Sequence, residues 1–382
     1  MTCPSFLRGS GDQELGDLHL QSCVAARSDA GATVLLAEAG CGPGCRDGML
    51  TQMRTANSSR VVAVSSADRL GLGLAALGRP AYITAGREHD VGAARSVADM
   101  RSRTAEVLDA AYAGGIRYVD AARSYGRSEE FLADWLTSRP AVTDVVVASK
   151  WGYRYVGDWR MDSEVHEVKD HTLNAFSTQL AQSRALLGDR LNLYQVHSVT
   201  EDSPVLGDAA LQGALADLRD AGVRVGLSTS GPRQSAVIRA VLDLSVNGSR
   251  LFSSIQSTWN VLETSAGPAL AEAHQAGVDV VVKEVFANGR LVPDTTDPAS
   301  GVRRAARLAA ELGVGLDQLA LAATLGQPWV PRVLSGAVTA AQVRSHLAAV
   351  TIEVPADRLA ELTDCAEDPE QYWASRSRRA WA

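Results

Sequence analysis

From about residue 68 onward, the hydrophobic pattern of the chain alternates regularly between two periods. Short runs of β-branched and other apolar residues are each followed by a polar or glycine-containing turn, and then by a segment with helical spacing. After one strand before the first helix, strands are predicted at residues 116–121, 144–149, 191–197, 224–228, 252–256, 279–283 and 333–336. Helices are predicted near residues 103–113, 128–137, 170–187, 208–221, 232–244, 267–276, 301–312 and 339–350.

This alternation of strands and helices favours one α/β architecture over another. Strands separated by helices pair in parallel. We count about eight strand–helix units between residues 66 and 365, which favours a closed (β/α)8 TIM barrel. An open, doubly wound sheet is the alternative. Glycines just after several predicted helices suit left-handed helix ends, and Thr339 with Gln342 suits a capping box.

A glycine motif at residues 71–76 tests the doubly wound alternative. Its spacing, Gly-x-Gly-x-x-Ala, fits a variant of the dinucleotide-binding fingerprint, which must open a helix. Gly78 and Pro80 follow almost at once and would break such a helix. We therefore interpret the motif as a glycine-rich loop at the first barrel strand.

The two ends of the chain differ from this core. Residues 1–65 are rich in Gly, Ser and Ala without sustained periodicity, so we expect a disordered extension or a mis-assigned start, with Met49 or Met53 as the true first residue. Four of the five cysteines fall there, and their spacing matches no usual zinc pattern, so no metal site is predicted. Residues 366–382 are expected to form a C-terminal tail.

Charge and hydropathy exclude several classes of protein. The net charge of −7 argues against a nucleic-acid binder. No apolar run approaches the ~18–20 residues that a spanning helix requires, and no signal peptide is recognised. A cytoplasmic protein with reduced thiols is expected. The sequence leaves the oligomeric state open.

Four reactive side chains lie at or just after successive predicted strand ends. Asp120, Lys150 and His197 end the second, third and fourth strands, and Tyr125 follows Asp120 in the same loop. In a barrel these positions share one mouth, where the chemistry of such folds takes place. Only three of the 37 basic residues are lysines, which draws attention to Lys150 at the end of a valine-rich strand.

The four side chains suit proton transfer to an oxygen atom. Asp120 would neutralise a buried Lys150, and the lysine would lower the pKa of the nearby tyrosine. Such a tyrosine can donate a proton, while a neutral histidine orients a carbonyl group. The set contains no nucleophile–base pair for acyl transfer and no metal-ligand group.

Three stretches of sequence resemble the aldo/keto reductase family. They are Gly-Ile-Arg-Tyr-Val-Asp-Ala-Ala-Arg-Ser-Tyr-Gly at 115–126, Ala-Ser-Lys-Trp-Gly at 148–152 and Leu-Tyr-Gln-Val-His-Ser at 193–198. Their order and spacing match the family's Asp–Tyr–Lys–His tetrad. The match continues through later segments in the same order, so that it covers roughly residues 68–350. The resemblance implies a barrel that transfers hydride between NADP(H) and an aldehyde, a ketone or the corresponding alcohol.

The same resemblance implies roles for individual residues. Tyr125 would be the proton donor, Lys150 and Asp120 its tuning pair, and His197 the orienting group. The implied cofactor-binding residues are Ser228 and Gln256 at the nicotinamide amide, and Ser335, Gly336, Ala337 and Arg344 at the adenosine phosphate. NADP(H) is favoured over NAD(H), although Gln342 stands where the family often has a basic residue. Lys283 or Glu284 replaces the aromatic residue that usually stacks on the nicotinamide; Lys283 is either a second active-site cation or a structural partner of Glu284.

Aromatic residues are concentrated in a few places, although they make up only 5% of the chain. They cluster after the third strand and in the tail, which suits the walls of a small-molecule pocket. Trp151, Tyr153 and Trp259 are the predicted pocket residues. Two other functions stay open from the sequence: a cofactor-binding barrel that acts as a regulatory or partner module, and a Schiff-base aldolase that uses Lys150 or Lys283.

Overall fold

The computed structural model describes residues 66–84 and 86–381. The predicted N-terminal extension, with its four cysteines and both alternative start methionines, lies outside the described residues.

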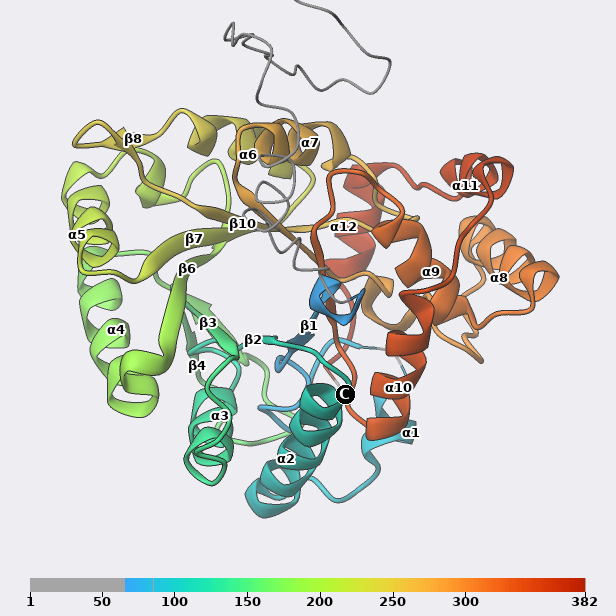
Figure 1. The fold of residues 1–382 in the computed structure, drawn as a ribbon, viewed down its shortest axis with the longest axis horizontal. Helices are drawn as coiled ribbons and strands as arrows, with labels where there is room; N and C mark the ends of the chain where they lie inside the picture. The colour runs from blue at the N-terminus through green and yellow to red at the C-terminus, as the bar shows by residue number, and fades with distance from the viewer. Residues whose placement is uncertain (1–65, 85, 382) are drawn as a thin grey trace, which may run out of the picture. The chain divides into compact units, whose positions relative to one another are not determined.

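Eight parallel strands close into a barrel, which confirms the predicted fold class (Figure 1). Around the barrel the strands follow the order β1, β12, β11, β10, β7, β6, β3, β2, and every neighbouring pair is parallel. Their bounds are β1 Leu70–Gly73, β2 Tyr118–Asp120, β3 Val146–Trp151, β6 Leu191–Val199, β7 Arg224–Thr229, β10 Ser254–Thr258, β11 Asp279–Lys283 and β12 Arg332–Ser335.

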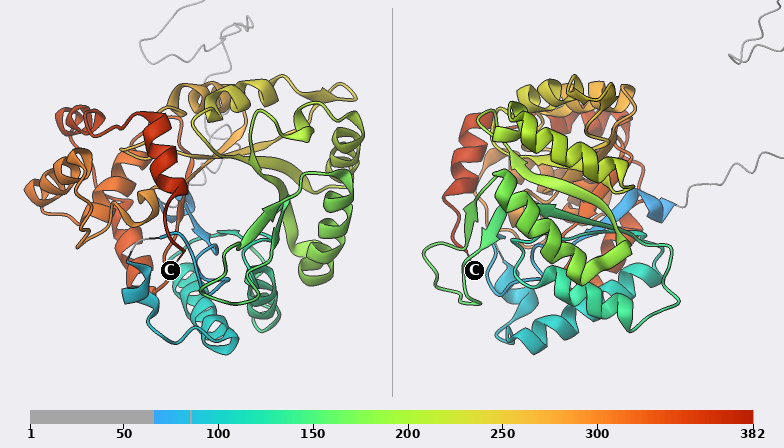
Figure 2. Two further views of the ribbon diagram at one scale, coloured as in Figure 1. Left: turned by 180° about the vertical axis from the view of Figure 1, so that it is seen from behind. Right: turned by 90° about the vertical axis from the view of Figure 1, so that its left-hand side faces the viewer.

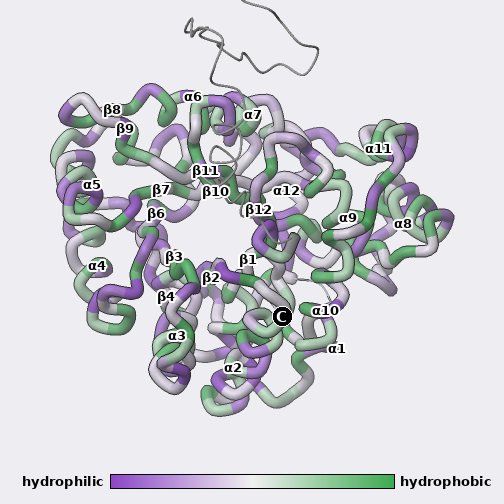
Figure 3. Tube along the Cα trace, viewed as in Figure 1, coloured by the Kyte–Doolittle hydropathy of each residue, from purple (hydrophilic) through white to green (hydrophobic). Residues whose placement is uncertain are grey.

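Helices surround the strands, and most of them cover the outside of the barrel with a buried face (Figures 1 and 2). Their bounds are α1 Arg87–Val91, α2 Val97–Ala113, α3 Ser128–Thr137, α4 Leu173–Leu187, α5 Ala209–Asp220, α6 Gln234–Leu242, α7 Gly267–Gln275, α8 Ser300–Leu312, α9 Leu316–Leu325, α10 Ala340–Ala349, α11 Ala356–Thr363 and α12 Pro369–Ser377. Hydrophobic and hydrophilic stretches alternate along this outer ring, as amphipathic helices require (Figure 3).

Short elements complete the described chain. Two antiparallel hairpins are formed by β4 Tyr153–Tyr155 with β5 Glu167–Lys169, and by β8 Ser245–Val246 with β9 Ser249–Arg250. Single 3-10 turns are η1 Ser66–Arg69, η2 Gly188–Arg190, η3 Pro204–Leu206 and η4 Ala287–Gly289. The side view in Figure 2 shows α12 and the β4–β5 hairpin at the same end of the barrel, opposite the start of β1.

The sequence periods locate most of these elements. The predicted helix 128–137 and strand 279–283 match α3 and β11 residue for residue, and the other predicted elements differ from the observed ones by up to six residues at an end. Helices α1, α9, α11 and α12 and the two hairpins are not predicted. Helix α12 falls in the segment expected to be a tail, where Asp368 caps its first turn by accepting a hydrogen bond from the Gln371 amide.

Side-chain packing inside the barrel explains why glycine stands at position 71. A small cluster of buried side chains from five strands fills this space; it consists of Tyr118, Ala148, Leu193, Val281 and Leu334. A Cβ atom on Gly71 would lie 2.7 Å from the Leu334 side chain and 2.9 Å from the Tyr118 ring. Gly71 and Gly73 belong to strand β1 itself rather than to a loop, and a turn, not a helix, follows them. The motif therefore serves barrel packing.

Candidate active site

Three neighbouring strands bring their carboxyl ends together at one mouth of the barrel. Asp120 is the last residue of β2, Lys150 lies near the end of β3, and His197 lies near the end of β6. A bulge interrupts the pairing of β6 with β7 after Val196, and Ser198 has a left-handed backbone with φ 56°. Bulges re-aim side chains next to active sites, and this one follows directly on His197.

Lys150 and Asp120 form an ion pair inside the barrel. The Lys150 ammonium lies 2.5 Å from Asp120 Oδ2 and donates a second hydrogen bond of 2.9 Å to the Ala121 carbonyl. The lysine side chain is fully buried. A charge in this position is tolerated only because a carboxylate and a carbonyl oxygen compensate it.

Tyr125 lies between this ion pair and His197. The Lys150 ammonium is 4.5 Å from the centroid of the Tyr125 ring, and the phenol oxygen is 3.5 Å from His197 Nε2. The tyrosine and histidine rings meet edge to face, with centroids 5.4 Å apart. The structure thus brings all four predicted catalytic residues into one group.

Burial, rather than the neighbouring lysine, controls the protonation of this group. Burial raises the pKa of the Tyr125 phenol well above its ordinary value, Asp120 raises it further, and Arg79 opposes both. The predicted lowering of this pKa is therefore wrong, because Asp120 offsets the charge of Lys150 and the phenol has lost its water. Burial lowers the pKa of His197 well below its ordinary value, so its imidazole is neutral at pH 7.

The second oxygen of Asp120 is held by two amides. Gln195 and Gln256 each donate a hydrogen bond to Asp120 Oδ1, over 3.2 Å and 2.9 Å. The carboxylate is therefore fixed in the orientation that pairs with Lys150. Gln256, which the family resemblance assigns to the nicotinamide amide, is thus also a support of the ion pair, a role that sequence reasoning missed.

A cavity of about 360 Å³ opens over these residues. Tyr125, His197 and Gln256 line it on one side, and Ser335 and Gly336 line it at the end of β12. Tyr153 also lines it, with its ring 5.2 Å from that of His197. The volume lies within the range of small-molecule sites.

Two predicted pocket residues lie elsewhere. Trp151 is fully buried behind the cavity wall, where its ring packs against Phe176 at a centroid distance of 5.1 Å. Trp259 faces a second cavity on the outside of the barrel, together with Trp329. Strand alternation explains the first difference, because Trp151 follows Lys150 and so points to the opposite face of β3.

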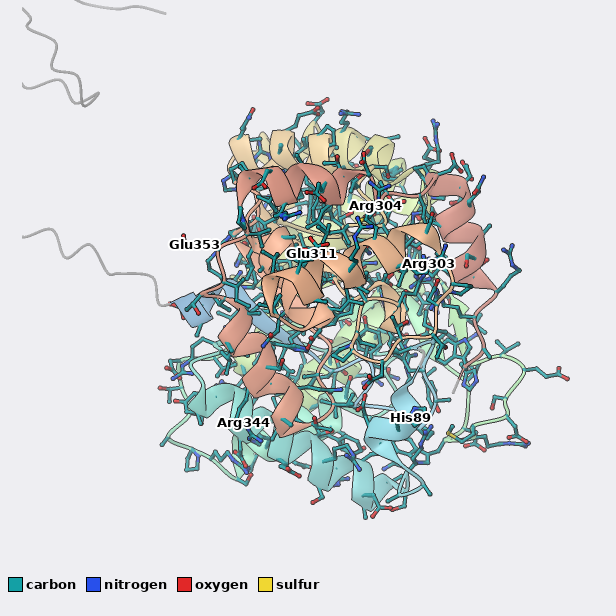
Figure 4. All side chains as sticks on the ribbon, turned by 90° about the vertical axis from the view of Figure 1, so that its right-hand side faces the viewer. His89, Arg303, Arg304, Glu311, Arg344 and Glu353 are labelled. Atoms are coloured by element: carbon teal, nitrogen blue, oxygen red, sulfur yellow. The ribbon has the colours of Figure 1, made fainter. Side chains whose placement is uncertain are left out.

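The predicted cofactor residues are only partly at the cavity. Ser335 and Gly336 line it, and a Cβ atom on Gly336 would meet only open space. The Ala337 amide donates to Ser335 Oγ over 3.2 Å, so it is already used within the loop. Ser228 is buried and accepts a hydrogen bond of 2.8 Å from the Ser198 amide. Arg344 is exposed on α10, as Figure 4 shows.

Charged residues that were not predicted also surround the cavity. Arg79, from the turn after β1, donates to Glu167 of β5 over 2.6 Å and lies against the Tyr125 ring. Arg376, from α12, makes two hydrogen bonds to Glu284, of 2.8 Å and 2.5 Å. Both pairs join segments about ninety positions apart in the chain, which no local sequence pattern indicates.

Lys283 lies at the cavity and next to Glu284. It lines the cavity, and its ammonium lies 3.7 Å from Glu284 Oε1 and donates to Thr258 Oγ1 over 2.8 Å. Burial lowers the pKa of Lys283 to about 8, with Glu284 opposing the shift. Burial would raise the pKa of Glu284, but Arg376 and Lys283 hold it at about 2.

Comparison with known proteins settles the family. The profile of the aldo/keto reductase family matches residues 69–367, which is well over half of the chain. The chain belongs to the aldo/keto reductase family. Members of this family are oxidoreductases that use nicotinamide cofactors, so the chain is an oxidoreductase of this kind.

Two curated relatives share about a quarter of the aligned residues with this aldo/keto reductase. It is 25% identical over 304 residues to Protein tas of Escherichia coli, covering 67% of this chain and 86% of that protein. It is 27% identical over 293 residues to a D-threo-aldose 1-dehydrogenase of Pseudomonas sp., covering 68% and 86%. The aldo-keto reductase AKR11C1 from Bacillus halodurans has the same fold, with a TM-score of 0.60, 24% identity, and coverage of 80% of this chain and 95% of that one.

The described residues contain neither a cluster of metal ligands nor a single membrane-spanning helix. Within residues 66–84 and 86–381, no three His, Cys, Asp or Glu side chains gather as a metal site requires. In the same residues no single helix is long and apolar enough to cross a bilayer. Helices α8 and α9 would reach that length and composition only as a pair, and the chain bends by 93° between them.

Proposed function

We propose that this aldo/keto reductase transfers hydride between NADP(H) and an aldehyde or ketone, with Tyr125 as the proton donor. The observation that carries the proposal is the contact of 3.5 Å between the Tyr125 phenol oxygen and His197 Nε2. Both groups line the cavity, and the Lys150–Asp120 pair lies buried beneath them. A carbonyl oxygen placed between the phenol and the imidazole would receive two hydrogen bonds.

The residues of the cavity fit a nicotinamide dinucleotide. Open space over the bare Gly336 backbone leaves room for a phosphate near the start of α10, where helix N-termini favour anions. Ser335 and Gln256 add hydroxyl and amide groups along the wall. Arg344 on the same helix is our candidate for the additional phosphate of NADP(H). When bound, the reduced cofactor supplies the hydride for the carbonyl carbon.

The protein side of the reaction follows from the geometry. Neutral His197 orients the carbonyl oxygen and stabilises the charge that develops on it. Tyr125 keeps its proton in the free protein because its pKa is raised, so the proton is present when the oxygen becomes basic. Lys150 then faces the phenolate that remains, and its ion pair with Asp120 keeps the lysine charged. A Schiff base would require a neutral amine, which disfavours Lys150 as an aldolase residue.

The test is Tyr125→Phe, which removes one oxygen atom and keeps the ring. We expect kcat for carbonyl reduction to fall on the order of 10²–10⁴-fold, as for loss of a general acid, while the Kd for NADPH stays within about twofold. Tyr82→Phe is the matched control, because Tyr82 lines the same cavity and its ring contacts are with Trp381 and Arg79. It should leave kcat within about threefold of wild type.

Two results would contradict the proposal. Turnover retained in Tyr125→Phe would exclude the phenol as proton donor. Tighter fluorescence-titrated binding of NADH than of NADPH would refute the proposed cofactor preference while leaving the reaction class intact.

A further inference from the structure

The charged side chains that line the cavity do not balance. Among the described residues that line it, the cations are Arg79, Lys283 and Arg376, and the anions are Glu167 and Glu284. Arg79 pairs with Glu167, and Arg376 binds both oxygens of Glu284. Lys283 shares Glu284 only at 3.7 Å, so one carboxylate serves two cations. The cavity wall therefore carries an excess positive charge, centred at Lys283.

This charge lies within electrostatic reach of the catalytic group. The ammonium of Lys283 contributes to the lowered pKa of His197, and Lys150 in turn contributes to the lowered pKa of Lys283. Lys283 also contacts the Thr258 hydroxyl on β10 and the Trp373 ring on α12, and Arg376 on α12 lowers its pKa. Only 14% of the Lys283 side chain is exposed, so solvent screens its charge weakly.

The two redox states of a nicotinamide ring respond differently to such a charge. The dihydronicotinamide ring is neutral, whereas the oxidised ring carries a positive charge. A ring that exchanges hydride with a carbonyl group held by Tyr125 and His197 must occupy this cavity, and so must share it with Lys283. The phosphates of the cofactor are the same in both redox states and do not affect the comparison.

We propose that Lys283 makes the cavity discriminate between the redox states of the cofactor, binding the reduced form more tightly than the oxidised form. The inference rests on the proposed function and goes beyond it, because it assigns a role to a residue outside the tetrad. An enzyme with this preference takes up reduced cofactor and releases the oxidised product readily, which suits carbonyl reduction.

The measured quantity is the ratio of the Kd for NADP⁺ to the Kd for NADPH, from cofactor fluorescence and competition. Lys283→Met keeps an unbranched side chain of similar length and removes the charge. It should lower this ratio on the order of tenfold at pH 7, which corresponds to about 1.4 kcal/mol. Lys169→Met is the matched control: it makes the same charge change at an exposed lysine of β5 outside the cavity. It should leave the ratio unchanged.

A second measurement uses the wild-type protein alone, so it does not depend on the folding of a variant. Lys283 is charged below its pKa of about 8 and neutral above it, so the ratio should fall as the pH rises from 7 to 9.5. Calorimetry in buffers of different ionisation enthalpy should show that NADP⁺ binding releases more protons near pH 8 than NADPH binding does.

The outcomes separate the two proposals. A ratio that is the same in wild type and Lys283→Met, and independent of pH, overturns the role of Lys283 even if the enzyme reduces carbonyl compounds. An equal fall in Lys169→Met also overturns it, since the effect would then reflect net charge. A protein that binds neither form of the cofactor overturns both this inference and the proposed function.

Discussion

Replacing Asp120 by Asn should destabilise the barrel strongly, because it leaves a buried ammonium without an ionised partner. Lys150 is fully buried, and apart from Asp120 its hydrogen-bond acceptor is the Ala121 carbonyl. Breaking a buried ion pair from one side costs about 3–5 kcal/mol. For a domain of this size, about 2 °C of Tm per kcal/mol gives a fall of roughly 6–10 °C.

The effect should depend on pH in a defined direction. Without the carboxylate, burial lowers the pKa of Lys150 further below its unfolded value. Between those two pKa values the unfolded state binds more protons than the folded state, so the stability of the variant rises with pH. The gap in Tm between Asp120→Asn and wild type should therefore be smaller at pH 9.5 than at pH 7.

The assay is thermal unfolding followed by tryptophan fluorescence, with the seven tryptophans of the chain as reporters. The decisive comparison is the double variant Asp120→Asn/Lys150→Met, which removes the stranded charge together with its partner. It should be more stable than Asp120→Asn alone. A double variant that is no more stable than the single one, or a single variant within about 1 kcal/mol of wild type, would refute this account of the ion pair.

Two further predictions concern packing and acid stability. Gly71→Ala should destabilise the barrel by about 1–3 kcal/mol, because the added Cβ lies 2.7 Å from the Leu334 side chain. Gly213→Ala in α5, where the Cβ meets open space, should instead stabilise the protein by about 0.5–1 kcal/mol. Urea unfolding of both variants checks the two signs. Glu284 has its pKa held at about 2, so its contribution to stability is present above its unfolded pKa of 4.5 and is lost as the pH falls toward 2. Glu284→Gln should thus lose stability relative to wild type at pH 7 but much less at pH 2.5, and an equal loss at both pH values would contradict the assignment.

The order of elements and the group of four at the mouth could be predicted because both depend on local signals. Each strand and helix has its own period, and parallel strands in a closed barrel place their carboxyl ends together. Asp120, Lys150 and His197 could therefore be assigned to one site before their distances were known. The direction of the Tyr125 pKa shift could not be predicted, because it depends on how completely the ring is buried.

The charged residues around the cavity could be identified only from the structure. Arg376 reaches Glu284 across 92 positions, and Arg79 reaches Glu167 across 88, so neither pair leaves a trace in any sequence window. Helix α12 did leave one signal: Asp368 followed by Pro369 is a typical helix start, and it would have located the helix that carries Arg376. Trp151 is predicted to line the pocket from its aromatic character alone, whereas the alternation of side chains along β3 directs it to the opposite face from Lys150.

The backbone of the cavity rim limits how this enzyme can be re-engineered. Ser198, Glu284 and Asn288 all line the cavity with left-handed backbone, at φ values of 56°, 56° and 55°. Residues other than glycine and asparagine adopt this conformation at a cost of about 1 kcal/mol or more. β-branched or bulky replacements at these three sites would add backbone strain, whereas Tyr153 and Phe286 line the same cavity with ordinary backbone geometry, so directed evolution of substrate range should begin with them.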